Sequence, residues 1–246
     1  MNLLPLELII IIFDYCDEKS KFNFGSIDSN TNHIFWSNMI TKTIYINDYD
    51  AYIKWNKNKC ITRIKFSNKF NNDITNLYII SPNIKKIIFG TEYNQPVDHL
   101  PELLEEIVFG RDFNQSINNL PNSVKKITFG SKFNQSVDNL PQNLIYLSFG
   151  WFFNQSVEFL PQNLKYLSFI GFYNKSINNL PPMLTHLTMN DLFNDPIDHL
   201  PNTITDLTLG YFFNQELIKL PTNLVNLKII GKFNKILQLN ILPPIF

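Results

Sequence analysis

The stretch LIYLSFGWFFNQSVEFLPQN, residues 144–163, recurs along most of the chain as the pattern L-x-x-L-x-F-G-x-x-F-N-Q-x-V-x-x-L-P-x-x. An asparagine returns every 20 residues, and an aromatic residue precedes each of them. These asparagines are Asn94, Asn114, Asn134, Asn154, Asn174, Asn194, Asn214 and Asn234. Self-similarity at a short fixed period is typical of stacked coils that bury their apolar faces against each other, so the sequence predicts a repeat solenoid.

Each part of the repeat predicts one part of a coil. Leu144, Leu147 and Phe149 alternate as on a strand with one buried face. The glycine that follows, such as Gly150, is expected to turn the chain with a positive φ. The Leu-Pro pair disfavours a helix in the return segment, because proline fixes φ and lacks an amide proton. The prediction is a leucine-rich-repeat-like solenoid with one parallel β-sheet and irregular or 3₁₀ return segments.

The recurring asparagines predict an internal ladder with a structural role. Identical side chains on successive coils lie about 4.8 Å apart, and an amide both donates and accepts hydrogen bonds. A buried amide must find such partners. We therefore expect Asn94 through Asn234 to lie inside the coils, each amide bonded to the amides above and below it.

The ends of the array differ from its middle. Residues 84–234 carry the regular repeat, and residues 41–83 contain degenerate coils. Residues 1–40 lack the repeat and are expected to form a small helical segment of two or three short helices. Residues 235–246 are predicted to form a C-terminal cap or tail, since an uncovered coil would expose strand edges and core.

The composition argues against several classes of function. Lysine and arginine number 21 and are balanced by 21 acidic residues, without a basic block, which argues against nucleic-acid or membrane partners. The longest apolar run, residues 8–13, is far shorter than the roughly 20 residues of a membrane span. Only two cysteines are present and no basic start of a signal peptide precedes the apolar run, so a cytoplasmic location is expected.

No catalytic or cofactor motif occurs in the sequence. G-x-S-x-G, P-loop, H-E-x-x-H and C-x-x-C patterns are all missing. His99 and His199 share one register but lie five coils apart, about 24 Å at one strand spacing per coil, so they are too distant to share a metal ion. The sequence therefore predicts a protein that is not an enzyme and holds no metal or cofactor.

The Phe-Asn-x-x-Ile/Val core followed by Leu-Pro, from Tyr93 to about Asn234, closely resembles FNIP repeats, which are common in amoebae and in giant DNA viruses. In that family the repeats often follow an F-box, and LPLELIIIIF, residues 4–13, is similar to the F-box opening. The resemblance implies that the Skp adaptor of a cullin-RING ubiquitin ligase is bound by Leu4, Pro5, Leu8, Ile12 and Phe13. The alternative is that the N-terminal helices only cap the array.

Two sets of non-core residues indicate where a protein partner would bind. The outward positions of the middle strands carry Tyr146, Tyr166 and His186. In the turns after the strands, aromatic residues replace the polar residues of other coils, and clustered exposed rings are common anchors of interfaces. The candidate partner-binding residues are Tyr146, Trp151, Tyr166, Phe172, His186 and Tyr211. Alternatively, the turn residues fold back over the coil as a second apolar layer.

These features together predict a non-enzymatic substrate-recognition protein. Its F-box-like helices would dock the Skp adaptor, and its FNIP solenoid would bind a protein target for ubiquitylation, in the host cytoplasm if the chain is viral. The alternative is a structural or scaffold solenoid unrelated to ubiquitin. Neither hypothesis includes nucleic acid or a membrane among the partners.

Overall fold

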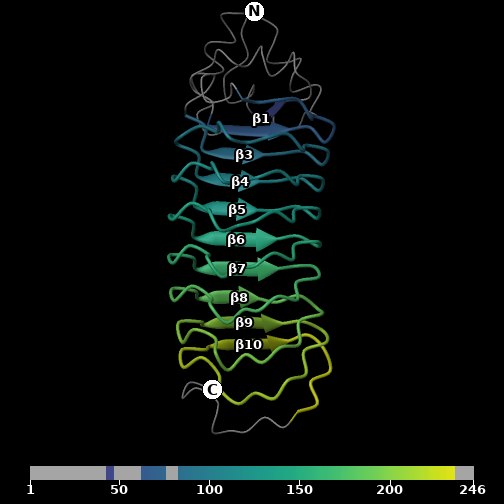
Figure 1. The fold of residues 1–246 in the computed structure, drawn as a ribbon, viewed down its shortest axis with the longest axis vertical. Coiled ribbons are helices and arrows are strands. Elements are labelled where there is room, and N and C mark those ends of the chain that lie inside the picture. Colours follow the sequence, from purple (N-terminus) through teal and green to yellow (C-terminus); the bar gives the residue numbers. More distant parts are fainter. Residues whose placement is uncertain (1–42, 47–61, 76–82, 236–246) are drawn as a thin grey trace, which may run out of the picture.

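A computed structural model of the protein describes residues 43–46, 62–75 and 83–235, and their strands form one sheet of ten (Figure 1). The strands are β1 (Thr43–Ile46), β2 (Arg63–Phe66), β3 (Lys86–Ile88), β4 (Glu106–Val108), β5 (Lys126–Thr128), β6 (Tyr146–Phe149), β7 (Tyr166–Phe169), β8 (His186–Thr188), β9 (Asp206–Leu209) and β10 (Asn226–Ile229). They lie side by side in chain order, and every neighbouring pair is parallel. The predicted parallel solenoid is confirmed.

The return segments are turns, and no helix occurs in the described part of the chain. A repeated turn follows each Leu-Pro pair, closed by a hydrogen bond such as that from the Leu144 amide to the Pro141 carbonyl oxygen (3.1 Å). Proline suits the start of such a turn because its φ is already fixed. The irregular return that the sequence predicts is therefore present, and it keeps each coil thin.

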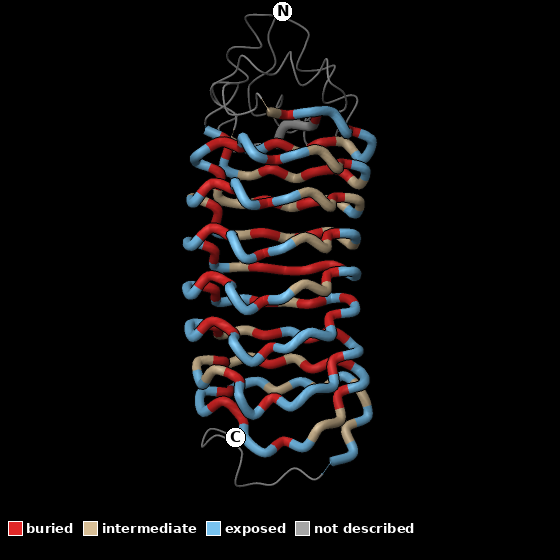
Figure 2. Tube along the Cα trace, viewed as in Figure 1, coloured by how far each residue is buried: buried red, intermediate tan, exposed pale blue. Residues whose placement is uncertain are grey.

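The inside of the solenoid is a double column of stacked aromatic rings. Within one coil the ring centroids of Phe149 and Phe153 lie 3.6 Å apart, and both side chains are buried. Across coils Phe149 stacks on Phe129 at 5.6 Å, and Phe153 stacks on Phe133 at 6.1 Å. Buried positions recur along the described coils (Figure 2). Each coil thus buries its rings against those of its neighbours, as the repeat predicts.

The glycines after the strands serve close packing of neighbouring coils. No glycine among the described residues has a positive φ, so the expected turn conformation is wrong. A Cβ placed on Gly130 would lie only 2.0 Å from the carbonyl oxygen of Gly110. Most other glycines of the repeat face the backbone of the preceding coil at a similar distance. Glycine is required here because the backbones approach too closely for any side chain.

The asparagines form a ladder at the edge of the coil, not inside it. The Asn134 side-chain oxygen accepts hydrogen bonds from the backbone amide of Asn154 (2.9 Å) and from Nε2 of Gln155 (3.1 Å). Backbone-to-side-chain bonds of this kind run from Asn71 to Asn174 and again from Asn194 to Asn234. None of these asparagines is buried, so the expected buried amide-to-amide ladder is wrong. Instead, the side-chain oxygen accepts a hydrogen bond from the backbone N–H of the asparagine in the next coil. That N–H lies outside the strands, so the sheet does not supply its acceptor.

The regular stack is interrupted between the coils of Asn174 and Asn194. Within the described ranges no hydrogen bond joins these two residues, and no ring contact joins Tyr173 to Phe193. Asn190 stands there in the place of the usual glycine, is buried, and donates from Nδ2 to the Tyr173 carbonyl oxygen (2.9 Å). The buried amide thus satisfies a carbonyl group at the point where ladder and ring column both break.

We expect Asn134→Leu to lower the free energy of unfolding by about 1–2 kcal/mol, because the half-buried backbone amide of Asn154 loses its acceptor and Gln155 loses one of two. Asn134→Asp keeps an oxygen at this place and should stay closer to the parent. Denaturant unfolding of the three proteins measures the difference. Equal stability of the leucine variant and the parent would show that the ladder contributes nothing.

Candidate functional site

One row of side chains crosses the outward face of the sheet without interruption. We call it the sheet-face stripe, and it consists of Lys86, Glu106, Lys126, Tyr146, Tyr166, His186, Asp206 and Asn226. Each is the first residue of its strand, and each lies directly opposite the next across a parallel pair. Because the repeat keeps one register over all these strands, side chains far apart in the sequence become neighbours about 4.8 Å apart.

The first part of the stripe is a chain of charges. Lys86 Nζ lies 3.0 Å from Glu106 Oε2, and Lys126 Nζ lies 3.5 Å from Glu106 Oε1. Partial burial opposes ionisation of Glu106, but the two ammonium groups hold its carboxyl pKa below the ordinary value. Lys126 also lies over the ring of Tyr146, with Nζ 4.8 Å from the centroid. The charges therefore lead directly into the aromatic part of the stripe.

The second part of the stripe is a chain of rings that ends on a carboxylate. The centroids of Tyr146 and Tyr166 lie 6.0 Å apart, and those of Tyr166 and His186 lie 4.3 Å apart. His186 Nε2 is 3.3 Å from Asp206 Oδ2, and Asn226 Nδ2 donates to Asp206 Oδ1 (2.7 Å). The hydroxyl of Thr205, then the Asn226 amide and His186, lower the pKa of Asp206. Asp206 is therefore held as a carboxylate that anchors the end of the row.

The rings of the stripe are held in place yet remain accessible. Tyr166 is 38% exposed, and the side chain of His186 is 41% exposed. Beside them on the same face runs a second row with small hydroxyl groups, Thr128, Ser148, Ser168, Thr188 and Thr208, of which Ser148 is buried. Ring faces flanked by hydrogen-bonding groups suit binding of a polypeptide surface, since they combine apolar contact with polar contacts at low entropic cost.

The hydroxyl next to His186 is not arranged as an activated nucleophile. Thr185 Oγ1 lies 2.9 Å from His186 Nδ1, but its hydroxyl donates to the Lys165 carbonyl oxygen (3.1 Å). The backbone carbonyl therefore competes with the imidazole for the single hydroxyl proton. No group of three or more His, Cys, Asp or Glu side chains that could hold a metal ion occurs in the described ranges.

A second set of exposed apolar residues lies in the turns after the strands. We call it the turn ridge, and it consists of Trp151, Phe152, Ile170, Phe172, Leu192, Tyr211, Phe212 and Ile230. These side chains are 45% to 56% exposed, so they do not fold back as a second buried layer. Trp151 contacts Phe172 (centroids 5.6 Å apart), and Tyr211 contacts Phe212 (5.1 Å). In the described part of the chain no ring contact joins the ridge to the stripe, so the predicted candidates fall into two separate groups.

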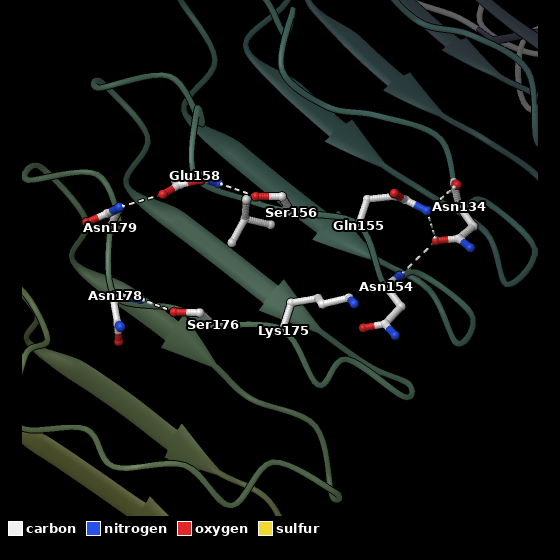
Figure 3. A pocket seen from close by; sticks show the side chains of 10 residues that line it. Asn134, Asn154, Gln155, Ser156, Glu158, Lys175, Ser176, Asn178 and Asn179 are labelled. Carbon is white, nitrogen blue, oxygen red and sulfur yellow. Dashed lines mark hydrogen bonds between the residues drawn. The ribbon is translucent and has the colours of Figure 1, made fainter.

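A polar hollow of about 550 Å³ opens among the return segments, near the interruption of the stack (Figure 3). Among its lining residues are Gln155, Glu158, Lys175 and Asn179, with Asn179 Nδ2 donating to Glu158 Oε1 (3.0 Å). Lys175 stands where other coils have the glutamine that binds the preceding asparagine. This replacement is visible in the sequence and marks the coil at which the hollow lies. Besides amide and hydroxyl groups, the lining holds one acidic and one basic side chain, Glu158 and Lys175.

Sequence reasoning missed several members of both surfaces. In the stripe it did not single out Asp206 and Asn226, although their spacing from His186 places them in the same register. On the ridge it missed Ile170, Leu192 and Ile230, which stand at or beside the turn positions of the aromatic residues. The proposed adaptor residues, Leu4, Pro5, Leu8, Ile12 and Phe13, lie outside the described residues.

The fold and the site define a parallel β-solenoid of the leucine-rich-repeat type. Residues 93–132, 133–172 and 173–212 match the FNIP Repeat family, so three tandem FNIP repeats form the middle of the array. No helix of the described ranges has the length and apolar content needed to cross a membrane. No curated protein matched the sequence.

Solved structures that resemble the chain include the following two. One is CroV588, described as a novel circular LRR protein structure, with a TM-score of 0.54 and 29% sequence identity. That match covers 77% of this chain but only 37% of CroV588, so the chain spans little more than a third of that protein. The other is InlP of Listeria monocytogenes, with a TM-score of 0.57, 17% identity, and coverage of 90% of this chain and 70% of InlP. The second likeness concerns the fold alone.

Proposed function

We propose that the chain is a non-enzymatic recognition solenoid that binds a protein partner through the sheet-face stripe. The observation that carries this proposal is the continuous row of contacts from Lys126 over Tyr146, Tyr166 and His186 to Asp206. A charge at each end holds the three rings between them in place. Rings fixed before binding lose little conformational freedom when a partner arrives, which favours affinity.

The chemistry of the row indicates what the partner presents. Tyr146, Tyr166 and His186 span three strands, about 10 Å, which fits one apolar anchor side chain or a short segment of a partner. The tyrosine hydroxyls and the accessible hydroxyls of Ser168 and Thr188 would bind polar groups around that anchor. The likeness to leucine-rich-repeat structures supports a protein as the partner in general.

Affinity capture from cytosolic extract tests this proposal. We expect the full chain to retain a partner that the double variant Tyr146→Ala with Tyr166→Ala loses, while the melting temperature changes by no more than a few degrees because both side chains are partly exposed. Phe159→Ala is the matched control, since Phe159 is 65% exposed but lies in a return segment. Capture of the same set of proteins by the parent chain, the double tyrosine variant and the control would contradict the proposal.

We further propose that the N-terminal segment links the solenoid to a ubiquitin ligase in the cytoplasm. Support comes from the likeness of LPLELIIIIF, residues 4–13, to the opening of an F-box. Coexpression with a Skp-type adaptor is expected to yield a complex, and Leu8→Asp with Phe13→Ala should abolish it. The array should keep its melting temperature in this variant, because coils contact only their neighbours.

Absence of the adaptor complex with the parent chain would remove the ubiquitin link. A variant that loses the adaptor and also unfolds the array would indicate that the segment acts as a cap. In either case the scaffold alternative would stand, and the stripe would have to be tested by itself.

A further inference from the structure

The turn ridge is apolar over only part of the solenoid. At the same turn positions, earlier coils have charged residues that pair with each other. Asp112 binds Arg111 (3.0 Å) and Lys132 (2.9 Å). From Trp151 onward, the turns expose mostly rings and aliphatic side chains instead, with Asp191 as an exposed charge among them. The boundary between a paired charged end and an apolar end therefore lies between Lys132 and Trp151.

The exposed area of the ridge is that of one half of a protein interface. Its eight side chains are 45% to 56% exposed. Since an aromatic side chain offers about 150–250 Å² and five of the eight are aromatic, the ridge leaves on the order of 700 Å² uncovered. A standard interface buries about 800 Å² per partner, whereas monomers rarely expose contiguous apolar patches above a few hundred Å². The ridge is therefore large enough to hold a stable partner.

The rings of the ridge follow nearly the same order in both directions, whereas Ile170 and Ile230 have no apolar counterpart. An adjacent ring pair, Trp151 and Phe152, occupies one level, and a second pair, Tyr211 and Phe212, occupies the level three coils further on. Phe172 and Leu192 lie on the two levels between them. Successive levels are about 4.8 Å apart. A two-fold axis midway between Phe172 and Leu192 would therefore place each ring pair against the other pair of a second copy, and Phe172 against Leu192.

We propose that the turn ridge is the interface of an antiparallel two-fold homodimer of this chain. In such an interface the same patch serves on both copies, and the order of the two ring pairs fits this arrangement. Lys132, already paired with Asp112, and Lys232 lie at the two ends of the ridge, and the two-fold axis places them on the same level of the interface. Asp191 is an exposed charge beside Leu192, so the ridge is mostly but not wholly apolar. The chain has a net charge of zero, so two copies meet without overall repulsion.

The dimer goes beyond the proposed recognition function and uses a different surface. The stripe begins each strand, whereas the ridge follows the strand end, so the stripe stays free on both copies. Two stripes on one particle allow bivalent binding, which strengthens attachment to a partner with two matching sites. Loss of the dimer would leave single-site recognition by the stripe intact.

Sedimentation equilibrium of the full chain tests the proposal. We expect the parent to form a dimer at concentrations up to about 100 µM, and Phe152→Glu with Phe212→Glu to weaken dimerisation at least about 30-fold. Phe159→Glu is the matched control, because it makes the same change at an exposed phenylalanine outside the ridge. Thermal unfolding identifies any variant that fails to fold. A monomeric parent, or equal loss of dimer in the control, would overturn the proposal.

A charge-exchange experiment tests the antiparallel register. Phe152→Lys alone and Phe212→Glu alone should each dissociate the dimer, because each places a charge against an apolar ring of the second copy. The double variant should regain dimerisation, since opposite charges then face each other across the axis. Failure of the double variant to recover, with an unchanged melting temperature, would contradict the two-fold pairing.

Discussion

Gly130→Ala is expected to lower the free energy of unfolding by more than about 3 kcal/mol, although it adds a single methyl group. The added Cβ would lie 2.0 Å from the Gly110 carbonyl oxygen, 2.4 Å from its carbon and 2.8 Å from the Arg111 Cα. All three atoms belong to the backbone and cannot rotate away. The two coils would have to separate, which disturbs the ring columns and the strand pairing at once. Denaturant unfolding monitored by circular dichroism measures the loss.

Ser131→Ala is the control for this glycine variant. Ser131 is the next residue, is partly exposed, and already has a Cβ, so its change should be within about 0.5 kcal/mol of the parent. If Gly130→Ala were as stable as Ser131→Ala, the close approach of neighbouring backbones would not be what requires glycine in the repeat.

Phe149→Ala is expected to cost about 3–5 kcal/mol, because it opens a cavity in the middle of the double ring column. Phe149 is fully buried and stacks on Phe153 at 3.6 Å, Phe169 at 5.4 Å and Phe129 at 5.6 Å. Coils on both sides therefore lose contacts, and thermal unfolding should show a large decrease in melting temperature. Phe159→Ala removes an equal side chain from a site that is 65% exposed and should change stability little.

The strands and their register could be predicted from the sequence because they follow from two periods, the two-residue alternation within a strand and the 20-residue repeat between coils. Leu207 and Leu209 alternate with the less buried Asp206 and Thr208, which defines a strand with one buried face. The 20-residue repeat then places equal residues opposite each other, as Tyr146 and Tyr166 are. A register shift would turn the apolar side chains outward, so one pairing is strongly favoured.

The roles of glycine and asparagine could not be predicted in the same way. The sequence shows that Gly130 follows Gly110, but not how close two thin coils come, and that distance decides why glycine is needed. It also shows that Asn134 and Asn154 align, but not whether their side chains point inward. The Asn134 side-chain oxygen lies at the edge of the coil because the backbone amide of Asn154 needs an acceptor there.

Individual residues of the candidate site could be proposed from the sequence, but their division into two surfaces could not. Tyr146, Tyr166 and His186 share a register, so their adjacency follows from the repeat. Trp151 and Phe172 come after the strand ends, and their side chains make contacts with each other instead of with the tyrosines. The division into stripe and ridge depends on the path of the turn, which the repeat pattern does not specify.

Site-specific photo-crosslinking tests most directly whether the sheet-face stripe binds a protein. Tyr166 would be replaced by p-benzoyl-phenylalanine in the full chain, and the same replacement at Phe159 would serve as the control on the return side. Irradiation in cytosolic extract is predicted to give a defined covalent adduct from position 166 and none from position 159. Adducts of equal yield from both positions, or none from position 166, would contradict recognition by the stripe.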